Sequence, residues 1–337
     1  MRVAVLFDPG GEHWDKKDIA AVVDGAKVIR RHIRRLGHEA TLVPIRPNDW
    51  RYISRIRRCD LVFNLCEGLD GHSRYEDWVV GTLELTGVPY TGCRPWATSV
   101  CHRKHMANVL LAANGIPVPR SALAKRNQIP DGLAFPVIVK PANEDASLGI
   151  DNGAVCTSID DLKRRIALMS EQYDSVMVQE FVDGREFNVG FVGKTMLPLS
   201  EISFADMPEG YWHIVSYAAK WDEGSPEDRG TIPQCPARVP EDLARKLTSV
   251  ARAAWEMLCE SEGYGRVDLR VDRSGQVAVI EVNPNPDISE DAGLARMAQA
   301  YGWDYTELTN RVMNEALERA ASRKAGQAGR PQMSGAV

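Results

Sequence analysis

In the N-terminal part of the chain, short runs of apolar residues alternate with segments in which apolar residues recur at helical spacing. Short apolar runs at 2–7, 40–44 and 61–64 predict strands, and the helical spacing over 19–36 stops at Gly37. A further helix is expected over 76–86. Because strand–helix alternation is typical of a parallel sheet covered by helices, we expect an α/β unit here. Functional loops in such sheets follow the carboxyl ends of strands, which is where FNLCEG at 63–68 stands.

The rest of the chain predicts two more units and a tail. Helices are expected at 98–114, 158–170, 240–259 and 305–321, and strands at 137–140, 176–181, 186–192, 265–271 and 277–282. The last two strands flank the turn Asp-Arg-Ser-Gly and predict a hairpin. We therefore divide the chain into an N-terminal α/β domain at 1–97, a central subdomain at 98–182, a C-terminal subdomain at 183–321 and a disordered tail at 322–337.

Composition narrows the class of protein. The chain has 337 residues and a formal net charge of −5, so it lacks the basic excess typical of nucleic-acid binding. It shows neither a signal-peptide pattern nor an apolar run near the ~20 residues that cross a bilayer, so we expect a cytoplasmic protein without a membrane partner. Seven cysteines without a C-x-x-C pair indicate reduced thiols, and no metal site is expected at His102 and His105.

The predicted hairpin carries acids and an amide that suit a metal. Because side chains alternate along a strand, Arg266 and Asp268 share one face, and so do Glu281 and Asn283. Strand pairing can bring Asp268, Glu281 and Asn283 together, and their oxygens are hard ligands suited to Mg²⁺ on nucleotide phosphates. The alternative is two ordinary strands with salt-bridged charges.

Lysines supply the opposite charge. Lys140 ends the apolar strand FPVIVK, where burial without an anion would be costly. Lys104 lies at a helix start and Lys220 in the polar segment 204–235, and a triphosphate needs such cations. The alternative to phosphate binding is that these lysines form ion pairs with carboxylates of the protein itself. The small-residue loop 141–149 could close over phosphates, whereas neither a P-loop nor a G-x-G-x-x-G motif is present.

The order of these motifs resembles the ATP-grasp superfamily and, within it, the D-alanine–D-alanine ligases. The resemblance covers residues 1–321. Its carriers are FNLCEG at 63–68, GVPYTGC at 87–93, FPVIVKPA at 135–142, VQEFVDGREF at 178–187, AAKW at 218–221, CPA at 235–237, RVDLRVD at 266–272 and EVNPNP at 281–286. It implies an α/β ATP-grasp fold behind an N-terminal Rossmann-like domain.

The resemblance also implies a reaction and its residues. A carboxylate would attack ATP to give an acyl phosphate, an amine would displace phosphate, and the segment 204–235 would close as a lid. The implied nucleotide residues are Lys104, Lys140, Gln179, Glu180, Phe181, Val182, Glu186 and Lys220. The implied ligands of two Mg²⁺ ions, with Mn²⁺ as a substitute, are Asp268, Glu281 and Asn283. Arg266 would face the reacting carboxyl group. Related ligases suggest a homodimer.

The departures from the ligase pattern cluster at the substrate pockets. The family's G-S-S-x-G is Asp145-Ala146-Ser147-Leu148-Gly149, and the lid tyrosine is Trp221. In the family an N-terminal glutamate receives the ammonium group of the first substrate. Its counterpart in this chain is Asp15, the nearest by spacing, or Glu12. In the acceptor pocket Asp287 replaces a glycine, Ser-Leu becomes Ala292-Gly293, and Glu290 and Asp291 are acidic. Since these acids would repel a carboxylate, the acceptor is predicted to differ from plain D-alanine.

Two other functions stay open at this point. One is an authentic D-alanine–D-alanine ligase that tolerates the changes, and the other is a non-catalytic nucleotide-binding module. The complete set of lysines, acids and Arg266 argues against the second, because such a charge cluster is costly without turnover.

Overall fold

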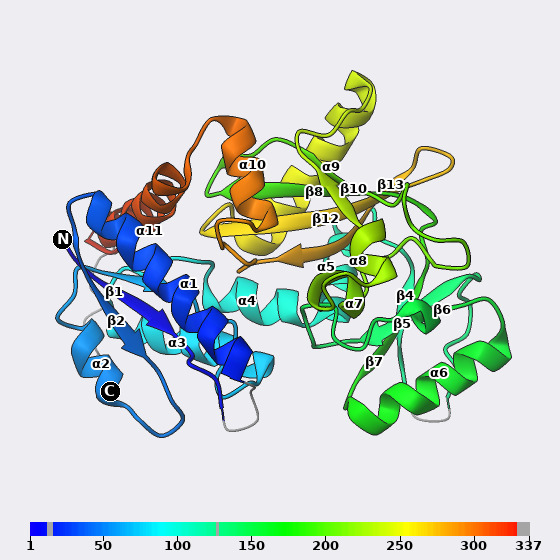
Figure 1. The fold of residues 1–337 in the computed structure, drawn as a ribbon, viewed down its shortest axis with the longest axis horizontal. Coiled ribbons are helices and arrows are strands. Elements are labelled where there is room, and N and C mark those ends of the chain that lie inside the picture. Colours follow the sequence, from blue (N-terminus) through cyan, green and yellow to red (C-terminus); the bar gives the residue numbers. More distant parts are fainter. Residues whose placement is uncertain (12–15, 126–127, 329–337) are drawn as a thin grey trace, which may run out of the picture.

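The computed structural model describes residues 1–11, 16–125 and 128–328. Glu12 and Asp15, the two candidates for the first substrate's ammonium, lie outside these residues. Within them the chain forms three sheets, one in each of the three predicted segments (Figure 1). Of the helices in this part of the chain, none combines the length and the apolar composition that crossing a bilayer requires.

The N-terminal sheet is parallel, as the strand–helix alternation predicts. Its order is β2-β1-β3, with β1 at Arg2–Phe7, β2 at Glu39–Pro44 and β3 at Leu61–Asn64. The long helix α1 at Lys16–Arg35 and α3 at Glu76–Thr86 match the predicted helices, and Gly87 ends α3 in the left-handed conformation. The short helix α2 at Arg51–Ile56 and a 3₁₀ turn at Ser73–Tyr75 were not predicted.

The single helix expected over 98–114 is wrong, since the structure has two helices there. Helix α4 covers Pro95–His102 and α5 covers Lys104–Ala113, with Arg103 between them at φ −94° and ψ 77°. Lys104 therefore begins a new helix, and its backbone N–H donates to the carbonyl of Ala142 over 3.0 Å. The break turns the start of α5 toward the loop that follows β5.

The central sheet is antiparallel in the order β4-β7-β5-β6. Its strands are β4 at Ser121–Ala124, β5 at Val137–Pro141, β6 at Val155–Cys156 and β7 at Val176–Glu180. Beside it lie the 3₁₀ turn at Asn152–Ala154 and helix α6 at Ile159–Gln172. Leu162, Ile166 and Met169 of α6 are buried against Val139 and Val178, so the helix covers one face of this sheet.

The C-terminal sheet has the order β11-β10-β8-β12-β13, and β9 pairs with the last residues of β8. Its strands are β8 at Gly184–Val192, β9 at Thr195–Met196, β10 at Ser200–Ser203, β11 at Ile232–Gln234, β12 at Tyr264–Asp272 and β13 at Val277–Asn283. The predicted hairpin of β12 and β13 is confirmed. Helix α9 at Glu241–Cys259 packs Trp255 so closely on Gly265 that a Cβ there would lie 2.3 Å from the indole ring.

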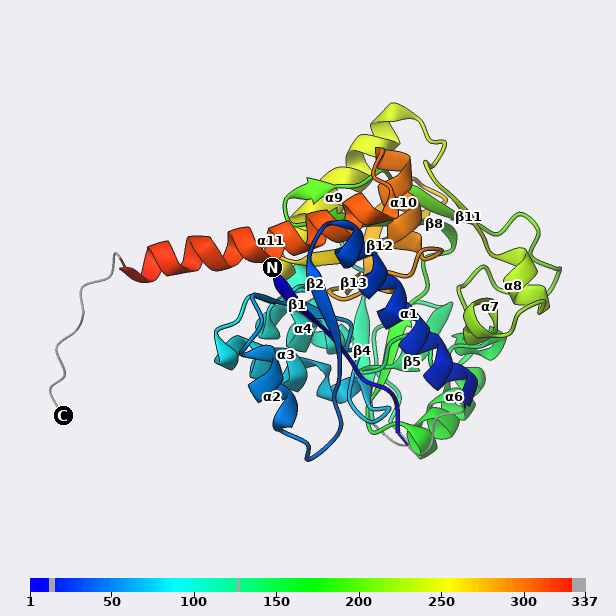
Figure 2. The same cartoon turned by 60° about the vertical axis from the view of Figure 1, so that its left-hand side comes forward.

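The last two helices return to the N-terminal domain. Helix α10 covers Gly293–Tyr301 and α11 covers Tyr305–Ala328, and α11 lies beside α1 (Figures 1 and 2). Leu308 and Val312 are buried in the core that contains Val3 and Val5 of β1. Because α11 continues to Ala328, a disordered tail from 322 is wrong for residues 322–328. Residues 329–337 of the predicted tail lie outside the described part of the chain.

Candidate active site

The hairpin of β12 and β13 places four of its polar side chains opposite one another in two pairs. Arg266 pairs in register with Asn283, and Asp268 pairs with Glu281. The guanidinium of Arg266 donates two hydrogen bonds, of 2.7 and 2.8 Å, to the Asp268 carboxylate. Asn188 of β8 donates a third to the same carboxylate over 2.7 Å. The predicted convergence of the acids on one patch of sheet is therefore present.

Lys104 connects this patch to two other elements. Its buried ammonium group forms an ion pair with Glu281 and donates to Asp145 Oδ1 over 2.5 Å. Burial of Glu281 opposes ionisation, but Lys104 and then Lys140 outweigh it and hold the pKa of Glu281 well below its usual value. Glu281 is therefore a carboxylate in the neutral pH range, in the form that binds a metal ion.

Lys140 lies buried at the end of β5. Burial lowers the pKa of its ammonium to about 8, and Glu281 opposes this shift. Among the residues that the structure describes, none forms an ion pair or hydrogen bond with Lys140. A buried cation without a partner fits an anion such as a phosphate group.

The predicted adenine border is formed by the end of β7. Gln179 is 2% exposed, and its Nε2 finds no hydrogen-bond partner in the described part of the chain. The backbone N–H of Phe181 already donates to the carbonyl of Pro136 over 2.9 Å. Glu180, Phe181 and Val182 line an open pocket of about 470 Å³. Gln179 is not among the residues that line this pocket, but its unpaired buried amide fits a polar partner such as a nucleobase.

Arg270 is a site residue that the sequence analysis missed. Its guanidinium donates to Glu186 over 3.0 Å and to the carbonyl of Val182 over 2.8 Å. It also donates to the carbonyl of His213 in the lid segment and lies 4.9 Å from the ring centroid of Phe181. The signal was available, because Arg270 follows Arg266 and Asp268 at alternate positions of one strand.

The segment 204–235 lies against the loop that follows β5. It contains helix α7 at Tyr217–Trp221 and helix α8 at Pro226–Gly230, and the rest is irregular apart from β11. Ser147 donates to the carbonyl of Val215 over 2.9 Å, and the indole N–H of Trp221 donates to the carbonyl of Ala146 over 3.1 Å. Figure 2 shows α7 and α8 at the outer side of the molecule.

The lid brings Lys220 of α7 into the cleft. Part of its side chain is exposed to solvent. Desolvation of its ammonium group by the surrounding protein, followed by the positive charge of Arg266, lowers the pKa of Lys220. The loop beneath it is conformationally unusual, since Ala146 and Ser147 have φ of 55° and 60°. Left-handed conformations are uncommon outside glycine and cluster at ligand-binding sites.

A buried polar network next to these residues was also missed. His102 lies between two carboxylates, with Nε2 bonded to Glu76 and Nδ1 3.1 Å from Asp145 Oδ2. Burial would lower the pKa of His102, but Glu76 and Asp145 raise it to about 9, so the ring is an imidazolium at neutral pH. Asn285 donates to Glu76 over 2.9 Å and accepts from the hydroxyl of Tyr264 over 2.6 Å. The network thus joins α3, α4, the loop after β5 and the end of β13.

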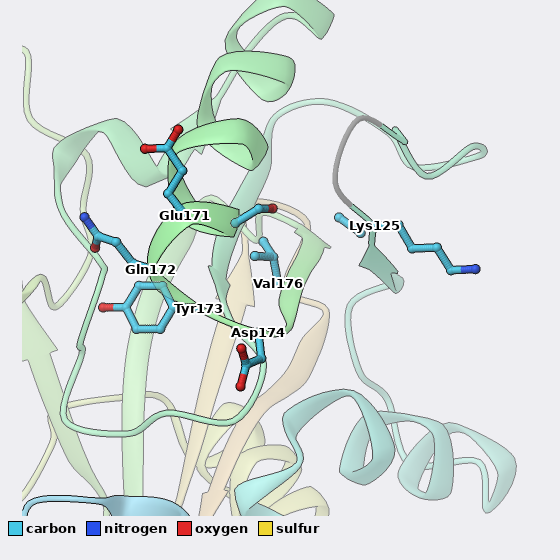
Figure 3. Close-up of a pocket in the computed structure, with 8 residues that line it drawn as sticks. Lys125, Glu171, Gln172, Tyr173, Asp174 and Val176 are labelled. Atoms are coloured by element: carbon cyan, nitrogen blue, oxygen red, sulfur yellow. The ribbon is translucent and has the colours of Figure 1, made fainter.

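A second pocket lies away from these groups. Figure 3 shows Glu171, Gln172, Tyr173 and Asp174 at the end of α6, across from Lys125. It shares no residue with the predicted site.

Comparison with solved structures defines the fold class of the protein. A solved D-alanine–D-alanine ligase of Bacillus anthracis, complexed with ATP, matches 96% of this chain and 99% of its own length with a TM-score of 0.75 and 22% sequence identity. The fold is therefore the α/β ATP-grasp fold that the resemblance predicts.

Sequence comparison then gives the family. The family model described as "D-ala D-ala ligase C-terminus" matches residues 112–314. A D-alanine–D-alanine ligase of Synechococcus is 32% identical over 98% of both chains. An uncharacterized protein of Sinorhizobium fredii is 31% identical over 78% of this chain and 76% of its own length. The chain belongs to the D-alanine–D-alanine ligase family and is an ATP-dependent, ADP-forming ligase.

Proposed function

We propose that this ligase joins a small-molecule carboxylate to an amine other than plain D-alanine, through an acyl phosphate. The observation that carries the altered acceptor is the gathering of carboxylates around Glu67. Burial and then the charges of Asp287, Glu76 and Asp145 raise the pKa of Glu67 to about 8. Of these acids, Asp287 has no cationic partner among the residues that the structure describes, so an acceptor carboxylate near it would meet repulsion. The alternative is that this chain, like the relatives named D-alanine–D-alanine ligase, uses D-alanine as its acceptor.

Asp287 stands where the resemblance places a backbone-donating glycine. Its Oδ1 accepts from the backbone N–H of Ser289 over 2.8 Å and from its hydroxyl over 2.6 Å. Glu290, two positions before Ala292 and the start of α10, lies 3.2 Å from Nε2 of His32. The pKa of His32 is lowered by burial and the charge of Arg35, so its ring does not neutralise Glu290 at neutral pH.

The residue roles are part of the same proposal. Lys104, Lys140 and Lys220 bind the phosphates, and Gln179 to Val182 with Glu186 border the nucleoside. Asp268, Glu281 and Asn283 hold two Mg²⁺ ions, for which Mn²⁺ can substitute. When bound, these ions would neutralise negative charge on the phosphates during phosphoryl transfer.

Other side chains act on the organic substrates. Arg266 lies opposite Asn283 and donates to the oxyanion of the tetrahedral intermediate. Ser147 and Trp221 keep the lid closed over the first substrate, because they bond across the loop and lid, and closure excludes water from the acyl phosphate. Asp15 or Glu12 receives the first substrate's ammonium group.

We also propose that the protein is cytoplasmic and forms a homodimer. Trp78 and Leu85 of α3 are 66% and 90% exposed, and Trp96 of the neighbouring helix α4 is 59% exposed. Exposed large apolar side chains on adjacent helices are typical of an interface. Light scattering at several protein concentrations tests the dimer.

A product assay tests the altered acceptor. The protein is incubated with Mg²⁺, ATP and D-alanine and with a panel of amines, which includes D-alanine, amino-acid amides and diamines. ADP is measured together with the mass of any condensed product. We expect faster ADP release with an amine that lacks a carboxylate. Efficient formation of D-alanyl-D-alanine at ordinary substrate concentrations would contradict the altered acceptor. ADP release that none of the added amines accelerates, with no condensed product, would contradict the ligase function.

A further inference from the structure

Arg270 of β12 is a buried arginine whose three guanidinium nitrogens bond three different segments of the chain. Its Nε donates to Oε2 of Glu186 on β8 over 3.0 Å, and its Nη1 donates to the carbonyl of Val182 over 2.8 Å. Its Nη2 donates to the carbonyl of His213 in the lid segment 204–235. The Arg270 side chain is 3% exposed, so these bonds are shielded from water. One guanidinium therefore connects the proposed nucleoside border with the lid.

Aromatic rings pack on the same guanidinium. Its central carbon lies 4.9 Å from the ring centroid of Phe181 and 5.8 Å from that of Phe204, the first residue of the lid segment. Phe204 is buried and stacks on the ring of His213, with centroids 5.5 Å apart and 9° between the ring planes. Cation–π contacts are strongest where the cation is desolvated, as it is here. The start of the lid and its residue His213 are thus both held on Arg270.

This stretch of the lid has a second attachment, at Asn152. Nδ2 of Asn152 donates to the carbonyl of Gly210 over 3.1 Å, and Oδ1 accepts from the backbone N–H of Trp212 over 2.7 Å. Asn152 belongs to the central subdomain and Arg270 to the C-terminal sheet, so the lid is bonded to both. Loss of the Arg270 bond would leave this stretch attached through the central subdomain.

The Glu186 carboxylate depends on Arg270. Among the residues that the structure describes, Arg270 is its one hydrogen-bond and ion-pair partner. Burial raises the pKa of Glu186, and the charge of Arg270 is the first of the influences that oppose this shift. Oε1 of Glu186 makes no bond within the described part of the chain, so it can accept a hydrogen bond from a ligand hydroxyl. Removal of Arg270 would leave this buried carboxylate unpaired.

We propose that Arg270 is a positioning residue that couples the nucleoside site to the lid. Through Nε it orients the Glu186 carboxylate toward the ribose hydroxyls, and through Nη2 it holds the lid at His213. The assignment rests on the roles of Glu186 and the lid in the proposed function. A nucleoside that fixes Glu186 also fixes Arg270 and so favours the closed lid. Because such coupling is reciprocal, a closed lid must raise the affinity for a nucleotide that carries the hydroxyls.

Nucleotides with and without the ribose hydroxyls separate this coupling from a merely structural role. Wild-type protein, Arg270→Met and Arg270→Lys are titrated with Mg²⁺–ATP and with Mg²⁺–2′,3′-dideoxy-ATP, without a carboxylate substrate, and calorimetry gives the dissociation constants. Lid closure is measured at saturation with each nucleotide. The readout is the rate of tryptic cleavage after Lys220 and Arg229, the two basic residues of the segment 204–235.

Two further variants keep the comparison sound. Arg245→Met removes a guanidinium that is 66% exposed on α9, where it pairs with the 87% exposed Glu241, and is the matched control. Arg270→Lys keeps a positive charge beside Glu186 but cannot bond three partners with one planar group. It allows the test to proceed if Arg270→Met does not fold.

We expect wild-type protein to bind ATP roughly tenfold more tightly than the dideoxy nucleotide, because the accepting group is a charged carboxylate. ATP should also slow cleavage of the lid severalfold more than the dideoxy nucleotide does. In Arg270→Met both differences should fall below about twofold, and Arg270→Lys should lie between the two proteins. Arg245→Met should match wild type in both measurements.

Three results would overturn the proposal. The first is an equal loss of affinity for both nucleotides in the Arg270 variants with the wild-type ratio kept, since this would show a structural role. The second is a lid that ATP still protects better than the dideoxy nucleotide in these variants. The third is tighter ATP binding by Arg270→Met, because Arg270 would then obstruct the nucleotide site. Equal binding of the two nucleotides by wild-type protein would instead overturn the ribose role of Glu186 in the proposed function.

Discussion

Asp145 holds the ammonium group of Lys104 at 2.5 Å, at a position where a triphosphate would have to compete with it. The resemblance places a glycine at this position, and a glycine has no side chain that could make this contact. Asp145 also faces His102 at 3.1 Å, which anchors the loop after β5 to α4. A carboxylate in the phosphate site should weaken nucleotide binding, because the same cation must be released before a phosphate can use it.

The first prediction follows from this competition. Asp145→Asn removes the negative charge and keeps the size of the side chain, so the dissociation constant for Mg²⁺–ATP should fall roughly fivefold, which corresponds to about 1 kcal/mol. Isothermal titration calorimetry measures this constant. Asp151→Asn, at an exposed carboxylate of the same subdomain, is the control. Weaker nucleotide binding by Asp145→Asn would show that the contact organises the loop rather than competing with phosphate.

The second prediction concerns the buried ammonium of Lys140. Because burial lowers its pKa from 10.5 to about 8, the unfolded chain binds more protons between these pH values, and the free energy of unfolding should rise with pH there. Below pH 8 the charged form destabilises the unliganded protein. Lys140→Met should therefore increase the free energy of unfolding at pH 7 by up to about 3 kcal/mol and flatten the rise above pH 8.

Urea unfolding at pH 7, 9 and 10 tests this linkage. Lys163→Met, at a lysine that is 59% exposed on α6, controls for loss of a surface charge. Lys140→Met should bind Mg²⁺–ATP at least tenfold more weakly in the same preparations, since its cation is gone. A variant that is less stable than wild type without nucleotide at pH 7 would show that Lys140 has a stabilising partner in the folded chain.

The third prediction concerns lid closure. Trp221→Phe keeps an aromatic ring but removes the N–H that donates to Ala146 over 3.1 Å. A looser lid should admit water, so ADP release without amine should rise severalfold relative to ADP release with amine. A coupled assay for ADP, with and without acceptor, gives this ratio. Trp50→Phe, at a side chain that is 63% exposed before α2, should leave the ratio unchanged. Unaltered coupling in Trp221→Phe would contradict the lid role.

Sequence periodicity predicted those parts of the site that depend on local geometry. The hairpin pairs Asp268 with Glu281 because side chains alternate along strands, and the same rule would have found Arg270 on their face. The network of Glu76, His102 and Asp145 could not be found in this way. These residues lie far apart along the chain, and the packing of α3, α4 and a loop brings them together.

Two errors in secondary structure have physical causes. The apolar spacing continues through Arg103 with neither glycine nor proline, so nothing local indicates the end of α4. Tertiary contacts decide the break, among them the bond from the Lys104 N–H to Ala142. At the C-terminus, Arg323, Lys324 and Ala325 have high helix propensity, and α11 continues to Ala328 although the small and polar residues after Ala321 resemble a linker.

The central claim is that the acids of the hairpin and the lysines of three other elements converge on magnesium triphosphate. Glu281→Gln tests it most directly, because Glu281 pairs with Lys104 and lies opposite Asp268. Amine-dependent ADP release should fall by on the order of 10²-fold or more, whereas Glu241→Gln should match wild type. Turnover by Glu281→Gln at the wild-type rate would contradict the claim.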